Sequence, residues 1–143
     1  MSILEQIQAD TRYALKARER ERVGALRLLA SALQQDAKAG NDDEVAVLRR
    51  ERKRRFEAAD AFRSGGGEDR AVAEEAEAAL IDTYLPAELP EAELGELVDA
   101  AITETGATSM SEMGAVMGAA MAKVDGRADG KRVSAAVRSR LAG

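Results

Sequence analysis

The sequence predicts an all-α protein. Alanine, glutamate and arginine are abundant, only two of the 143 residues are proline, and runs of β-branched residues are few, a composition typical of helical proteins. Apolar residues also recur every three to four positions along much of the chain, as one buried helix face requires. We therefore expect a four-helix N-terminal subdomain followed by a three-helix C-terminal subdomain.

The first two helices are indicated by caps and by apolar spacing. Ser2 and Glu5 have the spacing of a capping box, so the first helix should run from there to about Lys16. The second helix should end at Gly40, since glycine favours the left-handed conformation that follows many helices. Its apolar stripe is Val23, Leu26, Leu29, Ala30 and Leu33.

The third and fourth helices should form a hairpin. Asn41 and Asp42 are the candidate caps of the third helix, and a run of three glycines breaks the helical pattern after it. The fourth helix should run from about Glu68 to Leu85, where Pro86 stops it. The apolar positions of the third helix are Val45, Leu48, Phe56, Ala59 and Phe62.

The segment PAELP separates two parts of the chain. We expect residues 1–88 to form an N-terminal helical domain and residues 89–143 a three-helix domain. The C-terminal helices should run from Glu91 to about Glu104, with Gly106 after it, and from Met110 to Val124, capped by Ser109 or Ser111. Asp129 should cap the last helix, whose apolar stripe is Val133, Ala136, Val137 and Leu141.

Some protein classes are disfavoured by what the sequence lacks. The longest apolar run, residues 114–122, is far shorter than the roughly 20 residues of a membrane helix, and no secretory signal is visible. Without cysteine there is no disulfide framework, so we expect a cytoplasmic protein. Without histidine or cysteine, the commonest general base, the thiolate nucleophile and the usual zinc ligands are missing. We therefore expect no metal, no cofactor and no independent catalytic centre.

Charge is distributed in blocks. Residues 68–112 carry one basic residue against 13 acidic ones, whereas residues 113–143 carry six against two. The densest basic run, RRERKRR at 49–55, could present a phosphate-binding face. However, a hairpin through the glycine run would place Arg55 opposite Glu77, so we favour internal pairing of these charges.

Three methionines, Met113, Met117 and Met121, form a stripe beside Gly114 and Gly118. Methionine stripes can mark adaptable binding grooves. More often they belong to the core, and small residues at four-residue spacing let a neighbouring helix approach closely. We favour core packing, because the last helix needs an apolar partner.

The stretch KVDGRADGK at 123–131 leaves two interpretations open. One is a plain helix connector, whose glycines permit positive φ and close backbone approach. The other is an anion or RNA-backbone site, because basic residues gather at a helix N-terminus, where free N–H groups and the helix dipole attract anions. The candidate nucleic-acid-binding residues are Lys123, Gly126, Arg127, Gly130, Lys131 and Arg132.

The chain resembles the GatB/YqeY family over essentially its whole length. The matching stretches are ALKARERERVGALRLLASAL, the segment from Ala78 to Leu89, and ETGATSMSEMGAVMGAAMAKVDGRADGKRV. The C-terminal part is similar to the tail domain of GatB, a subunit of the glutamine-dependent aminoacyl-tRNA amidotransferase. KVDGRADG matches the family's corner of the form K-x-x-G-R/K-A-D/N-G/P, with Asp125 where a basic residue is expected and Ala122 where a proline is common.

This resemblance implies a tRNA-contacting C-terminal domain and a family label of carbon–nitrogen ligase activity with glutamine as amido-N-donor. Because no catalytic centre is visible, we expect a non-catalytic, tRNA-associated accessory protein. Its few aromatic residues predict binding led by shape and charge rather than by base stacking. The alternative is a protein-interaction module that docks on an amidotransferase or another tRNA enzyme, through the acidic middle or an apolar groove. An enzyme in its own right would require glutamine turnover by the purified chain.

Overall fold

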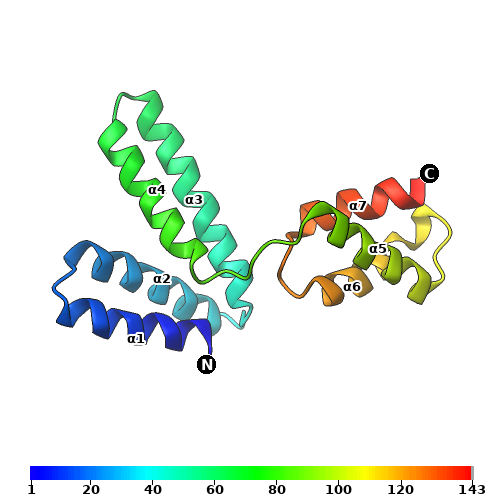
Figure 1. The fold of residues 1–143 in the computed structure, drawn as a ribbon, viewed down its shortest axis with the longest axis horizontal. Helices are drawn as coiled ribbons and strands as arrows, with labels where there is room; N and C mark the ends of the chain where they lie inside the picture. Colours follow the sequence, from blue (N-terminus) through cyan, green and yellow to red (C-terminus); the bar gives the residue numbers. More distant parts are fainter. Residues whose placement is uncertain (143) are drawn as a thin grey trace. The chain divides into compact units, whose positions relative to one another are not determined.

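The computed structural model confirms the all-α fold. It describes residues 1–142, and in that part of the chain no strand occurs and no helix is long and apolar enough to cross a membrane. Figure 1 shows the helices in chain order. Their bounds are α1 Ile3–Lys16, α2 Arg20–Lys38, α3 Glu44–Ser64, α4 Glu68–Asp82, α5 Glu91–Thr105, the 3₁₀-helix η1 Met110–Glu112, α6 Met113–Val124 and α7 Gly130–Ala142.

The chain divides into two compact units, Met1–Leu85 and a second that begins at Pro86. Each unit has a hydrophobic core of its own, and Leu89, which is 5% exposed, belongs to the core of the second. The division therefore falls at the start of the proline-containing segment 86–90. The assignment of residues 1–88 and 89–143 to two domains stays a prediction.

The first unit consists of two helical hairpins, α1 with α2 and α3 with α4 (Figure 1). Ser2 and Glu5 form the predicted capping box at the start of α1. The main core lies where the two hairpins meet. It packs α1 and α2 against the beginning of α3 and the end of α4. Its buried residues are Ile7, Ala14, Val23, Leu26, Leu29, Leu33, Val47, Leu48 and Ile81.

The hairpin of α3 and α4 has the predicted register. Arg55 pairs with Glu77 at 3.0 Å, and buried alanines, Ala59 and Ala78 among them, allow the two helices to approach closely. Burial raises the pKa of Glu77 above its ordinary value, and Arg55 partly offsets that shift.

Internal pairing of the RRERKRR run is confirmed for most of its cations. Arg50 pairs with Asp36 at 2.9 Å, and Arg52 pairs with Asp82 at 2.6 Å. Arg54 contacts the nearly buried Glu51 at 3.0 Å. Arg50 links α3 to α2 and Arg52 links α3 to α4, whereas the contact of Arg54 lies within α3. These ion pairs leave less of the run available to a phosphate.

Two predicted helix boundaries in the first unit are wrong. Asp43, rather than Asn41 or Asp42, caps α3, because its carboxylate accepts from the N–H of Ala46 while the Asn41 side chain forms a turn by accepting from the N–H of Asp43. The fourth helix ends at Asp82, not at Leu85. The N–H groups of residues 83–85 bond to carbonyls three positions back, a tightened last turn that suits a residue before proline.

The apolar stripe predicted for α3 is only partly buried. Phe56 is 37% exposed, whereas Val47, which the prediction left out, is 1% exposed. The Phe56 ring lies under the Arg52 guanidinium, 4.8 Å from ring centroid to charge. An aromatic ring can pack against a cation at the surface without entering the core. The prediction from periodicity that Phe56 belongs to the buried face of α3 is therefore wrong.

The second unit packs α5, α6 and α7 around a small aliphatic core. Gly106 follows the end of α5, as predicted, and it adopts the left-handed conformation. Before α6 the chain forms the short η1, and no side chain caps it at Ser109. Instead the Glu112 carboxylate accepts the N–H of Thr108 at 2.6 Å. The buried residues of this core include Leu94, Val98, Ala101, Val116, Ala120, Val124, Val133 and Val137.

The methionine stripe on α6 is not the centre of this core. Met113 and Met117 are partly buried against it, but Met121 is 39% exposed. A Cβ atom added to Gly114 or Gly118 would meet nothing within 4 Å. The close helix approach predicted at these glycines is therefore wrong, since the face of α6 that enters the core carries valine and alanine instead.

Candidate nucleic-acid interface

The predicted corner is the connection between α6 and α7. After Val124, Asp125 and Gly126 have φ of 48° and 77°. This left-handed region accepts glycine and also short polar residues such as aspartate, which gives a conformational reason for an acidic residue at 125. Asp129 then caps α7 as predicted, because its Oδ1 accepts a hydrogen bond from the N–H of Arg132 at 2.8 Å.

Arg127 closes the end of α6. Its Nε donates to the carbonyl oxygen of Val124 at 2.9 Å, and its Nη2 donates to that of Lys123 at 3.0 Å. The last carbonyl groups of a helix have no partner within the helix, so the guanidinium caps them. The Lys123 ammonium in turn pairs with Glu104 at 2.8 Å. Both cations thus stabilise the second unit.

Arg132 fastens the segment before α5 to α7. Its Nη2 donates to the carbonyl oxygen of Leu89 and to Glu91, each at 2.8 Å, and its Nη1 donates to Glu88 at 3.1 Å. The hydrogen bond to Glu91 is the main cause that raises the pKa of Arg132 above its ordinary value. The neighbouring N–H of Leu89 donates to the carbonyl of Arg127 at 2.8 Å, which ties the corner to the same segment.

The first turn of α7 is the part of the corner that stays open. Lys131 is exposed, and its ammonium group has neither an ion pair nor a hydrogen bond within residues 1–142. A Cβ atom added to Gly130 would meet nothing within 4 Å. The Asp129 carboxylate accepts only the N–H of Arg132, so the preceding N–H groups of α7 have no side-chain cap among the described residues. An anion can therefore approach this turn.

The structure brings the six predicted residues together, but it gives them different roles. Three of the four cations contact carboxylates or carbonyl groups, and Asp125 and Asp129 add negative charge to the corner. The positive and negative charges of the corner nearly cancel, so the electrostatic potential that a phosphate would encounter here is not strongly positive. That this corner binds nucleic acid stays a prediction, and Lys131 is its most accessible cation.

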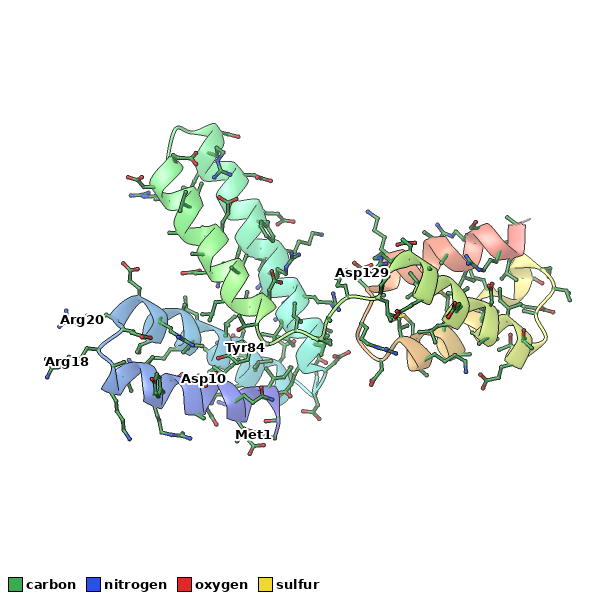
Figure 2. All side chains as sticks on the ribbon, in the orientation of Figure 1. Met1, Asp10, Arg18, Arg20, Tyr84 and Asp129 are labelled. Carbon is green, nitrogen blue, oxygen red and sulfur yellow. The ribbon has the colours of Figure 1, made fainter. Side chains whose placement is uncertain are left out.

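A second group of basic side chains, which the sequence analysis did not single out, lies at the turn between α1 and α2. Figure 2 shows Arg18 and Arg20 at the tip of this hairpin, directed away from the helices. The signal in the sequence was the arginine-rich run KARERER. It was overlooked because Glu19 and Glu21 alternate with the arginines and make the run look neutralised.

Tyr84 and Asp10 form a hydrogen-bonded pair in the first unit. The Tyr84 hydroxyl donates a short hydrogen bond to the Asp10 carboxylate (Figure 2), beside a pocket of about 620 Å³ that Gln6 and Arg22 also line. Burial, and then Asp10, raise the pKa of Tyr84 well above its ordinary value. The phenol therefore stays neutral and serves as a donor, which suits a structural link better than a catalytic base.

No feature of the described residues supports a metal centre. Residues 1–142 contain no group of three or more acidic side chains placed to hold a metal ion, and the sequence supplies neither histidine nor cysteine.

Comparison with known proteins identifies one matching family. Residues 4–141 match the family described as Yqey-like protein. A search among curated proteins finds no match. Because the family match extends from α1 to the last turn of α7, it includes both compact units and the corner between α6 and α7.

Proposed function

This chain belongs to the YqeY-like protein family, and on that premise we propose that it is a non-catalytic accessory protein that associates with tRNA. The resemblance of its C-terminal part to the GatB tail domain supports this class of ligand. The contact is made with the sugar–phosphate backbone at the corner between α6 and α7. The observation that carries the proposal is the open first turn of α7, where the Lys131 ammonium group and uncapped N–H groups are accessible.

The other residues of the corner shape this site rather than supply its charge. Arg127 and Arg132 hold the backbone in place, and Gly130 leaves room for a phosphate. Because carboxylates surround them, we expect weak, salt-sensitive binding that gains little from base contacts. In this proposal the carbon–nitrogen ligase label belongs to the enzyme that the protein accompanies, so the purified chain alone does not turn over glutamine.

The test is tRNA binding by the purified protein, titrated across salt, with K131E beside R138E. Arg138 lies on the same helix, is exposed and has no partner within residues 1–142, so it matches the change in charge. An acidic residue in the first turn of a helix is favourable, so K131E should fold normally. We expect K131E to weaken binding roughly tenfold and to reduce the salt slope by about one or more, while R138E has a much smaller effect.

Two results would contradict this proposal. If the wild-type protein does not bind tRNA at near-physiological salt, the association itself is wrong. If it binds but K131E and R138E behave alike, the association stands and the assignment to the first turn of α7 is wrong.

A second candidate function is docking on an amidotransferase or another tRNA enzyme. A groove of about 740 Å³ lies between α2 and α4, and it is lined mainly by alanine and leucine side chains, including Leu28, which is 54% exposed. Such a groove suits the apolar face of a partner helix. A complex with a purified amidotransferase that survives about 0.5 M salt and is weakened by Leu28→Asp would favour this function over direct RNA binding.

A further inference from the structure

The tip of the α1–α2 hairpin carries basic side chains that the rest of the fold does not use. Between Arg12 and Arg27 the chain has six basic residues and two acidic ones. Arg22 pairs with Glu19 at 3.6 Å. The other five, all exposed, have no ion pair or hydrogen bond from their side chains within residues 1–142, and they are Arg12, Lys16, Arg18, Arg20 and Arg27.

Most other cations of residues 1–142 have partners, and the exposed ones without a partner, Lys38, Lys131 and Arg138, are not gathered in one place. Most arginines of α3 contact acids at 2.6–3.0 Å, as Arg52 does with Asp82 and Arg63 with Glu75. In the second unit Lys123, Arg132 and Arg140 are likewise paired. The chain as a whole is acidic, with a net charge of −5, so carboxylates are plentiful. Positive charge that is left uncompensated in one place is therefore a local feature that can attract a polyanion.

Three of these arginines line one pocket. Arg18, Arg20 and Arg27 border a cavity of about 520 Å³, which the buried Ala14 and Val23 also line. The one carboxylate in its lining, that of Glu19, pairs with Arg22. A guanidinium group presents a planar fork of donors that matches the oxygens of a phosphate. Three such groups around one depression can bind a phosphate group more firmly than scattered lysines.

The backbone of the same turn adds donors and space. No side chain caps α2 at Glu19, so the first N–H groups of a 19-residue helix begin beside the pocket, and the helix dipole favours an anion there. Gly24, one turn further along α2, also lines the pocket, and a Cβ atom added to it would meet nothing within 4 Å. The floor of the pocket is therefore accessible to a bulky ligand such as a sugar–phosphate backbone.

Arg18 occupies a backbone conformation that a smaller residue would adopt more easily. Its φ is 61°, in the left-handed region, which is sterically unfavourable for a residue with a Cβ atom. Glycine and asparagine are the usual residues in this position after a helix. The presence of arginine at such a site indicates that its side chain contributes something that neither would.

We infer that the α1–α2 tip is a phosphate-binding surface for the backbone of the tRNA, with Arg18, Arg20 and Arg27 around the pocket and Lys16 and Arg12 extending the positive surface along α1. The inference rests on the proposed function, since it assigns to the first unit a second contact with the same nucleic acid. An RNA rather than an acidic protein is favoured because the pocket offers uncapped N–H groups and guanidinium forks, and only two of its lining residues, Leu15 and Val23, are large and apolar.

The experiment measures binding of bulk tRNA across salt for four forms of the full chain, which are the wild type, R18Q/R20Q, R18K/R20K and K38Q/R138Q. Lys38 and Arg138 are exposed and unpaired within residues 1–142, so the last variant removes the same charge elsewhere. We expect R18Q/R20Q to bind roughly tenfold more weakly, with a salt slope smaller by about two. R18K/R20K should keep the slope and lose part of the affinity, and K38Q/R138Q should resemble the wild type. Circular dichroism verifies that every variant is folded.

Each other outcome overturns a distinct statement. If the wild type binds tRNA and R18Q/R20Q matches K38Q/R138Q, the tip is not a phosphate surface, while the proposed function stands. If poly-glutamate binds the wild type as tightly as tRNA does, and R18Q/R20Q weakens the binding of both ligands equally, the tip is a surface for acidic proteins and the inference is wrong. If the wild type binds no tRNA, both the proposed function and the inference fail.

Discussion

Replacing Arg132 by alanine tests whether this residue stabilises the second unit by linking α7 to the segment before α5. The Arg132 guanidinium donates to the Leu89 carbonyl and pairs with Glu88 and Glu91. A hydrogen bond from a charged donor contributes about 1.5–3 kcal/mol. The acids are 54% and 81% exposed, so each ion pair adds only about 0.2–1 kcal/mol. Since water can replace part of the bond to Leu89 in the variant, we expect R132A to reduce the free energy of unfolding by about 2 kcal/mol.

Urea unfolding followed by circular dichroism measures this loss. R138A on the same helix is the control and should change the free energy of unfolding by less than about 0.5 kcal/mol, as exposed unpaired positions do. R132K keeps the charge but not the planar fork, so it should recover about half of the difference. If R132A loses no more free energy of unfolding than R138A does, Arg132 does not stabilise the second unit through these contacts. Arg132 would then be available to bind RNA.

Two further predictions concern α6 and the first unit. Gly114→Ala and Gly118→Ala should each raise the free energy of unfolding by about 0.5–1 kcal/mol, because an added Cβ atom meets nothing; destabilisation in the same urea assay would show that a neighbour packs against this face. The pKa of Tyr84 is raised in the folded protein by burial and by Asp10, so the unfolded chain releases the phenolic proton first and this contribution to stability is lost as pH rises above the ordinary value of about 10. Tyr84→Phe should therefore reduce the fall in stability between about pH 9 and 11, and an unchanged fall would contradict this account.

Local signals explain where the fold could be predicted from the sequence. The capping box of Ser2 and Glu5, the cap at Asp129 and the end of α5 at Gly106 each depend on a few neighbouring residues, and all three are confirmed. The pairing of Arg55 with Glu77 could also be predicted, because the connection between the two helices, residues 65–67, is too short to leave much freedom in how they align. Where several polar residues compete for one cap, as at the start of α3, the sequence alone did not choose correctly.

The candidate site shows the limit of the same reasoning. The sequence placed Lys123, Arg127 and Arg132 in a basic corner, but it could not show that their side chains reach Glu104, two carbonyl groups at the end of α6, and the segment at 88–91. The partners of Arg132 lie more than 40 positions away in the chain. Their meeting depends on how α5 and α7 pack, which no short-range pattern contains.

The sequence by itself determined that the chain is helical, where most helices begin and end, and that charge is gathered in blocks, because caps, periodicity and composition act over a few residues. Tertiary structure decided which charges are neutralised. It pairs most of the RRERKRR run with acids, engages most of the C-terminal corner, and leaves five of the six cations at the α1–α2 tip without partners within residues 1–142. The physical reason is that an ion pair requires two side chains within a few ångströms of each other, a distance that the packing of the helices sets and the order of residues does not.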